Sequence, residues 1–256
     1  PFEAIGLKAV DLKIIRIFED NVIQYLQVNQ FGNTSQLNRV GKPVSRKTIS
    51  LMESGVTNLN KWNRFTLDIS EFVKVEPGAL YQVDIAFRKS QSLFFCGTDV
   101  IDDLSTDEDW NEQEESSNWD WYENNYGGSY NWSQRDNPCD DSYYRYRNVN
   151  KLVFASDLGL IAKRGEDNQL FAFATNLLDT KQMSGVELKV FDFQQQNIGS
   201  GSTDPDGKAV IQLSGKPFAL MAKLGDQYGY LKLDDGSSLS LSNFNVTGQK
   251  IQKGIK

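Results

Sequence analysis

Histidine is absent from all 256 residues of the chain. Because histidine is the usual general base near neutral pH and a common zinc ligand, its absence excludes Ser-His-Asp and Cys-His catalysis and His-ligated zinc. Only two cysteines are present, Cys96 and Cys139, which is too few for a four-thiolate metal site. They form either one disulfide, which requires an oxidising compartment, or two separate buried thiols.

Long apolar runs and an excess of positive charge are also missing. No apolar run approaches the ~20 residues that a membrane helix needs, and nothing resembles a signal peptide. The chain has 27 basic and 34 acidic residues, a net charge of −7. Phosphate binding needs a basic face, so this balance argues against nucleic acid as a partner. Because the sequence begins at Pro1, we expect it to be a segment of a longer protein.

The negative charge is concentrated in one segment. Residues 97–138 contain twelve acidic residues and one basic residue, Arg135, so the remainder carries 26 basic and 22 acidic residues. Four of the five tryptophans also lie there. Residues 97–142 are therefore predicted to be an acidic, aromatic insertion between the last two strands of a first domain. A disulfide between Cys96 and Cys139 would close the base of this insertion.

Most of the remaining sequence alternates apolar and polar residues with period two, which is typical of half-buried strands. One exception follows the first strand, where Val22, Tyr25 and Leu26 have helical spacing and predict a short helix over residues 19–27, with Asp20 as its N-cap. Before residue 155, strands are predicted at residues 10–18, 43–52, 64–69, 79–88 and 151–154.

The second half predicts about seven short strands within residues 156–240. The clearest of these lie at residues 169–175, 185–193, 209–213 and 218–223. Turns occur roughly every ten residues, a spacing that favours a β-sandwich. One turn, Asp204–Gly207, superficially resembles a calcium loop. A calcium loop would need a glutamate at its twelfth position, where this chain has Gly215, so a tight turn is predicted.

Three short motifs resemble the macroglobulin-like domains in the N-terminal half of bacterial α2-macroglobulins. They are the strand Ser156–Leu160 (SDLGL), the step Ser184–Leu188 (SGVEL), and a hairpin with Thr203, Asp204, Gly207 and Ala209. The opening of the chain, LKIIRIFEDNVIQYLQ, looks like the preceding domain of such proteins. The resemblance implies an all-β fold of two consecutive antiparallel β-sandwiches of the immunoglobulin or fibronectin-III kind, the first with a short helix and a long acidic insertion.

The resemblance also implies a function and a location. Members of this family are periplasmic or outer-membrane-anchored proteins that trap proteases, and many carry a Cys-Gly-Glu-Gln thioester. Here Cys96 and Gly97 are followed by Thr98 and Asp99, so this segment has no thioester. We therefore expect non-catalytic structural modules without a cofactor. Their expected partners are neighbouring domains of the same chain and, through the full-length protein, target proteases.

The expected domain limits are residues 1–155 and 156–240, with residues 241–256 as a linker and the start of a third domain. Within the insertion, clustered carboxylates are candidate calcium ligands, namely Asp102, Asp103, Asp107, Glu108 and Asp109. Aromatic side chains there are candidates for contact with a protein or carbohydrate, as in an adhesin-type module; they are Trp110, Trp119, Trp121, Tyr122, Tyr126, Tyr130 and Trp132.

Two other interpretations of the acidic residues remain. The insertion is also consistent with a solvated acidic loop whose aromatic residues cover the sandwich. Paired carboxylates could also catalyse glycoside hydrolysis without histidine, although these acidic residues cluster in the insertion rather than at strand ends.

Overall fold

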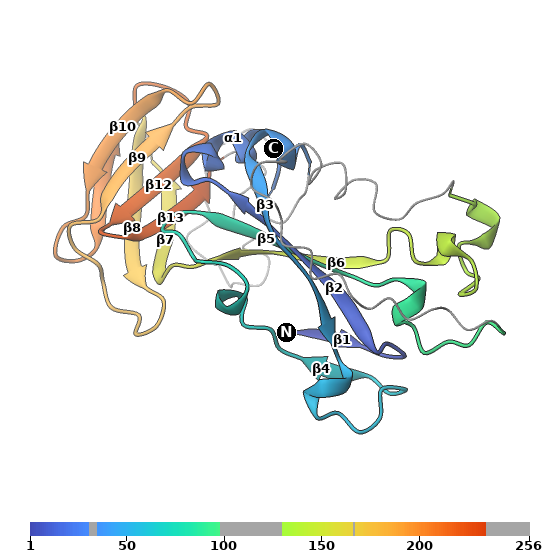
Figure 1. The fold of residues 1–256 in the computed structure, drawn as a ribbon. Helices are drawn as coiled ribbons and strands as arrows, with labels where there is room; N and C mark the ends of the chain where they lie inside the picture. Colours follow the sequence, from blue (N-terminus) through green and yellow to red (C-terminus); the bar gives the residue numbers. More distant parts are fainter. Residues whose placement is uncertain (31–34, 98–129, 166, 234–256) are drawn as a thin grey trace, which may run out of the picture. The chain divides into compact units, whose positions relative to one another are not determined.

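A computed structural model describes residues 1–30, 35–97, 130–165 and 167–233. Contacts divide the chain into two compact units, residues 1–157 and 158–256. The described residues form four antiparallel sheets and one short α-helix, which confirms the predicted pair of β-sandwiches (Figure 1). No described helix is long and apolar enough to cross a membrane.

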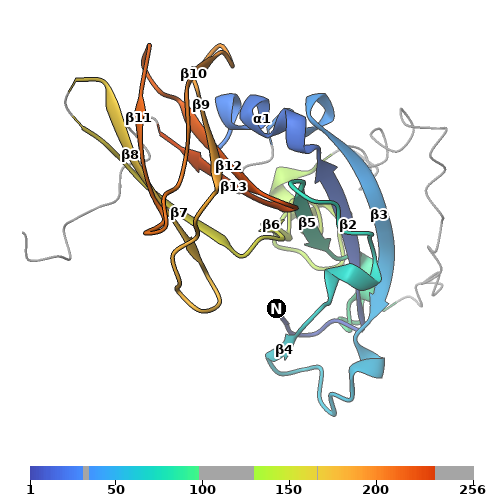
Figure 2. The same ribbon diagram turned by 90° about the vertical axis from the view of Figure 1, so that its left-hand side faces the viewer.

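The first unit has a four-stranded sheet with strand order β3-β2-β5-β6 and a two-stranded sheet, β1-β4. Its strands are β1 (Phe2–Ala4), β2 (Ala9–Ile17), β3 (Gly41–Ser50), β4 (Asn63–Phe65), β5 (Leu80–Ala86) and β6 (Asn148–Phe154). Alternate residues of β2, such as Val10, Leu12 and Ile14, lie in the core between this sheet and the segments that cover it. In Figure 2, β2 and β3 run side by side as long, twisted neighbours.

Two segments cover the inner face of the four-stranded sheet. At one end, β1 and β4 contribute Ala4 and Phe65 to a cluster with Val10 and Leu51. At the other end, residues 67–73 pack against Leu12 and Ile14. Short 3₁₀ turns connect the strands; they are η1 (Glu19–Asn21), η2 (Leu37–Arg39), η3 (Met52–Ser54), η4 (Ile69–Glu71), η5 (Lys89–Gln91), η6 (Trp132–Gln134) and η7 (Asp141–Tyr143).

The predicted helix is present as α1 (Val22–Val28), but its predicted cap is wrong. Asp20 lies within the 3₁₀ turn η1, and Asn21 occupies the N-cap position without a side-chain cap bond. The Asn21 side chain instead donates a hydrogen bond to the carbonyl of Val40 at 3.2 Å. Burial of Val22, Tyr25 and Leu26 therefore stabilises this short helix, because a seven-residue helix is marginal without tertiary packing.

The strand predicted at residues 64–69 is shorter in the structure, where β4 ends at Phe65. Asp68 accepts a hydrogen bond from the Ser70 amide at 2.9 Å and caps the turn η4. An aspartate side chain that bonds to a nearby backbone amide competes with the strand ladder, which explains the early end of β4.

The second unit is a sandwich of seven described strands. Its sheets have strand orders β10-β9-β12-β13 and β11-β8-β7. The strands are β7 (Leu158–Arg164), β8 (Gln169–Asn176), β9 (Glu187–Phe191), β10 (Asn197–Ser202), β11 (Lys208–Gln212), β12 (Ala219–Leu224) and β13 (Gln227–Lys232). Leu170, Leu188, Ile211 and Leu220 lie fully buried between the two sheets.

The predicted turn at Asp204–Gly207 is confirmed. The Asp204 carboxylate accepts hydrogen bonds from the amides of Asp206 and Lys208 at 3.0 and 2.9 Å. Gly207 has φ of +70°, and a Cβ at this position would lie 2.6 Å from the carbonyl oxygen of Ala174. The side chain of Asp204 therefore serves the turn, and glycine is required at its last residue.

Candidate functional site

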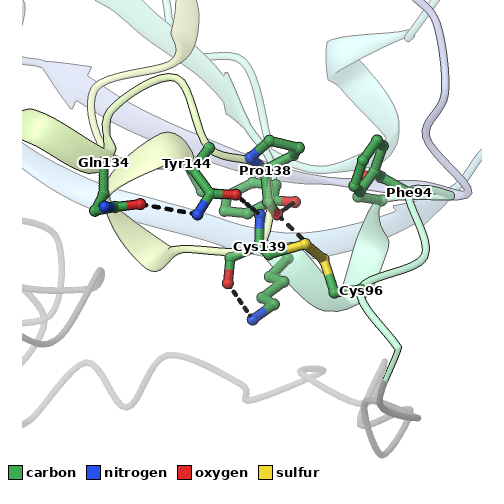
Figure 3. The surroundings of a disulfide bond; sticks show 9 residues. Phe94, Cys96, Gln134, Pro138, Cys139 and Tyr144 are labelled. Carbon is green, nitrogen blue, oxygen red and sulfur yellow. Dashed lines mark hydrogen bonds between the residues drawn. A yellow bond between two sulfur atoms is a disulfide. The ribbon is translucent and has the colours of Figure 1, made fainter.

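A disulfide joins Cys96 to Cys139 at the base of the acidic segment (Figure 3). The bond links the stretch that follows β5 to the stretch that precedes β6. Around it, Lys89 Nζ donates to the carbonyl of Cys139 at 2.6 Å, and the Tyr144 hydroxyl donates to the carbonyl of Pro138 at 2.6 Å. The disulfide therefore lies within a hydrogen-bonded base that connects two neighbouring strands.

Two capped 3₁₀ turns lie on either side of Cys139 in the chain, before β6 begins. Asn131 and Asp140 are the N-caps of η6 and η7, and each side chain accepts a hydrogen bond from the amide two residues later. The hydrogen bonds from Ser142 lower the pKa of Asp140 below its ordinary value. The Asn131 amide donates to the Ser142 hydroxyl at 2.9 Å, so the two turns are also joined to each other.

Trp132 is the one predicted tryptophan contact that the structure describes. Its side chain is exposed (68%), and the Arg135 guanidinium lies 3.5 Å from the ring centroid. Such a cation–π contact covers one face of the ring. Tyr130, another predicted contact, packs edge-on against Tyr146. The other predicted contacts lie outside the described residues; they are Trp110, Trp119, Trp121, Tyr122 and Tyr126.

The five candidate calcium ligands, Asp102, Asp103, Asp107, Glu108 and Asp109, also lie outside the described residues. In the part of the chain that the structure describes, no three acidic, cysteine or histidine side chains form a potential metal site. The predicted linker at 241–256 lies outside the described residues as well.

A groove of about 930 Å³ opens beside the disulfide, and all the residues that line it belong to the first unit. Three parts of the chain form its walls: the N-terminal residues 2–7, residues 92–94 just before Cys96, and residues 147–149 at the start of β6. Trp62, Pro138 and Tyr143 complete the rim. Most of the lining is apolar, and Trp62 and Phe94 remain exposed, at 68% and 57%.

A buried ion pair positions one wall of this groove. Asp11 on β2 is 2% exposed, and its carboxylate lies 2.8 Å from Arg88 Nε, a charge contact rather than an aligned hydrogen bond. The same carboxylate accepts hydrogen bonds from Gln91 Nε2 at 2.6 Å and Thr48 Oγ1 at 2.8 Å. Because Gln91 ends the turn η5, these bonds fix the start of residues 92–96.

A second charged pair is buried next to the first. Lys13 on β2 lies opposite Asp84 on β5 in the strand register. Burial lowers the pKa of Lys13 from 10.5, while the negative charges of Asp84 and Asp11 oppose this effect. Sequence reasoning missed both pairs. The available signal was the position of Asp11 and Lys13 inside an otherwise apolar strand, since buried charges are normally paired.

The second unit has an apolar outer surface on its three-stranded sheet. Ile161 of β7 lies opposite Phe173 of β8, and Val210 of β11 lies opposite Phe171. Ile161, Phe173 and Val210 are all exposed. Two lysines flank these residues, Lys163 next to Phe171 and Lys208 next to Phe173. Outward-facing strand positions of a free sandwich are usually polar, so three exposed apolar residues on one sheet are unusual. We call Ile161, Phe173 and Val210 the outer apolar face.

The four sheets define a protein of two β-sandwich modules, and a disulfide closes the base of the acidic segment in the first module. Residues 155–251 match the family model described as "Bacterial alpha-2-macroglobulin MG3 domain". Over these residues the chain is similar to the MG3 domains of bacterial α2-macroglobulins, which confirms the resemblance predicted from the sequence.

Solved structures share the fold over most of the chain. One is native α2-macroglobulin of Escherichia coli spanning domains NIE-MG1, at 16% identity and a TM-score of 0.51, covering 90% of this chain and 86% of that one. Another E. coli structure, spanning MG0-NIE-MG1, has 16% identity and a TM-score of 0.50, covering 91% of this chain and 57% of that one. At this identity the likeness concerns the fold alone. No match was found among functionally curated proteins.

Proposed function

We propose that the chain forms two non-catalytic structural modules of a protease-trapping α2-macroglobulin in the bacterial cell envelope. The observation that carries this proposal is the family match of residues 155–251. In such a trap, a protease cleaves a bait segment elsewhere in the full-length protein, which then changes shape around it. These sandwiches would contribute a scaffold, and their partners would be the neighbouring domains and, indirectly, the protease.

Two structural features support a scaffold role. The outer apolar face of the second unit suits a module that packs against other protein surfaces, because exposed apolar patches commonly mark interaction sites. The disulfide between Cys96 and Cys139 suits an oxidising compartment such as the periplasm.

A substrate-size assay tests the trapping function. The full-length protein that contains this chain is titrated into a panel of endopeptidases with different cleavage preferences. Each sample is then assayed with a large protein substrate and with a small chromogenic peptide. Trapping predicts that cleavage of the large substrate falls while cleavage of the peptide persists, because a small molecule still reaches the enclosed active site. Equal loss of both activities, or no loss with any endopeptidase, contradicts the proposal.

The rival function is carbohydrate or protein binding by the aromatic insertion. A glycan array separates the two possibilities, because the trap requires no glycan contact. Specific glycan binding that is lost in the Trp119→Ala/Trp121→Ala variant, together with unchanged protease activity in the assay above, would favour the adhesin-type module.

A further inference from the structure

The two sheets of the first unit differ in width. Strands in a sheet lie about 4.8 Å apart, so four strands span about 14 Å between their outer axes whereas two strands span about 5 Å. The sheet β1-β4 can therefore cover only part of the inner face of β3-β2-β5-β6. Among the described residues, the part left uncovered is at the β6 end, where Val149 lies opposite Ile85 in the register and is 57% exposed.

The groove lies over this uncovered part of the sheet. Ile85 and Val149 line it from the four-stranded sheet, Phe87 lines it from just after β5, and residues 2–7 line it from the opposite side. Phe2, Ile85 and Phe87 are only partly buried, although they pack on the cluster formed by Ala4, Val10 and Phe65. The apolar core of the first unit is thus continuous with the floor of the groove.

The strand β1 has one unpaired edge along this groove. Its residues pair with β4 on one side, with Phe2 opposite Phe65 and Ala4 opposite Asn63. In the described part of the chain, no strand pairs with the other side of Phe2–Ala4. Pairing on that side begins only at Gly6, whose carbonyl accepts from the Leu93 amide at 2.8 Å. Open strand edges of this kind accept an added strand, because their backbone donors and acceptors are available.

We propose that the groove binds an extended peptide segment, which pairs with β1 as a third strand and places alternate apolar side chains over Ile85, Phe87 and Val149. Neighbouring strands share the orientation of their side chains, so the inward residues of the added strand lie beside Phe2 and Ala4. The charged rim residues Arg147 and Asp136 face each other at 3.5 Å, which favours apolar rather than charged inward side chains.

The occupant is a peptide rather than a second copy of the chain. The open edge of β1 is only three residues long, and a stable interface between folded proteins buries about 1,600 Å². A flexible extended segment can instead enter the groove and place its side chains on the apolar floor. The proposal does not depend on protease trapping, because peptide binding is measured on this chain alone.

Binding is measured with a fluorescein-labelled peptide of eight residues in which Val alternates with Ser or Lys. Fluorescence anisotropy should give a Kd of about 10–100 μM, typical of short-strand addition with modest apolar burial. In ¹⁵N-labelled protein, the amide signals of Glu3 and Ile5 should shift on binding. A control peptide with N-methyl groups at alternate residues keeps the side chains and loses one row of backbone donors, so its affinity should fall at least about tenfold.

Two adjacent phenylalanines provide matched variants of the protein. Phe94 lines the groove, whereas Phe95 does not line it and is 75% exposed. Phe94→Ser should weaken binding roughly tenfold, because aromatic residues at the centre of a contact carry most of the binding energy. Phe95→Ser should leave the Kd unchanged and thereby controls for general loss of surface apolarity.

Three results would overturn the proposal. The first is no binding at 1 mM peptide. The second is equal binding of the N-methylated peptide or by the Phe94→Ser variant, which indicates non-specific apolar contact. The third is a concentration-dependent dimer in analytical ultracentrifugation that Phe94→Ser dissociates, which indicates that a second copy fills the groove. None of these results bears on the protease assay, so the two proposals fail independently.

Discussion

Asp11 is the residue on which the order of the groove wall depends. Its carboxylate is almost fully buried and bonds to Arg88, Gln91 and Thr48, so it ties three parts of the first unit together. Breaking a buried pair leaves the remaining charge without compensation. The Asp11→Asn variant is therefore expected to lose about 3 kcal/mol of unfolding free energy.

Urea unfolding followed by tryptophan fluorescence measures this loss, because every tryptophan lies between residues 62 and 132 and reports on the first unit. Asp136→Asn is the matched control. Asp136 also contacts an arginine, but its side chain is 73% exposed, and an exposed ion pair contributes less than about 1 kcal/mol. Equal effects of the two substitutions would mean that the Asp11 network does not stabilise the unit.

Lys13 is expected to make the unfolding free energy of the first unit change with pH in the alkaline range. Burial lowers the pKa of Lys13 below 10.5, its ordinary value in the unfolded chain. Between the two pKa values the unfolded state binds more protons than the folded state, so Lys13 makes stability rise with pH in that range. Urea unfolding from pH 8 to 10.5 should therefore show a more positive slope for the native protein than for Lys13→Met. Parallel slopes would contradict the lowered pKa.

Single residues also show what the sequence could not predict. The spacing of Val22, Tyr25 and Leu26 predicted the helix, and the predicted turn at Asp204 is present. The cap at Asp20 was wrong because Asn21 bonds to Val40, a residue far along the chain. The partners of Asp11 and Lys13 were likewise inaccessible, since strand pairing brings them together across separations of up to 80 residues.

At the scale of elements, the strongly alternating strands were predictable and the glycine-rich strand was not. β10 has the sequence NIGSGS, whose composition is typical of a loop. Gly199 and Gly201 nevertheless lie in this strand. Glycine is needed at both positions because an added Cβ would lie 2.9 or 3.1 Å from the Ile211 side chain. Glycine allows β10 to approach β11 of the opposite sheet, a tertiary reason that local sequence does not reveal.

The turn before β11 provides a test of backbone conformation. Gly207 and Gly185 both have positive φ, but only Gly207 has atoms close to the position of an added Cβ. Gly185→Ala should cost about 1 kcal/mol from the left-handed conformation alone. Gly207→Ala should cost at least about 3 kcal/mol because the backbone must also shift away from Ala174. Differential scanning calorimetry measures both, and equal losses would show that the turn relaxes freely.

The disulfide is the covalent connection between β5 and β6 and encloses a loop with a sequence separation of 43 residues. In the loop-entropy model, closing a loop of this length stabilises the folded state by about 4 kcal/mol. The Cys96→Ser/Cys139→Ser variant should unfold at correspondingly lower urea in the tryptophan signal. Mass spectrometry of unreduced peptides from periplasmically expressed protein should show the Cys96–Cys139 link. Two free thiols would contradict the pairing.

At the scale of the whole molecule, the family of the second unit could be predicted from three short motifs, because they mark the turns and strand entries of a sandwich. The groove could not, since it results from the unequal widths of two sheets formed by strands far apart in the chain. The sequence shows the alternation around Phe173, but the outer apolar face also needs Ile161 of β7 and Val210 of β11, which only strand pairing brings beside β8.

We propose that these modules belong to a protein that encloses proteases. Size-exclusion chromatography of the full-length protein with an endopeptidase tests this claim most directly, with a small chromogenic peptide used to detect protease activity in each fraction. Enclosure predicts that the peptide-cleaving activity elutes with the full-length protein and is inactive there toward a large protein substrate. Elution of all the activity at the position of the free protease, for every endopeptidase in the panel, would contradict the claim.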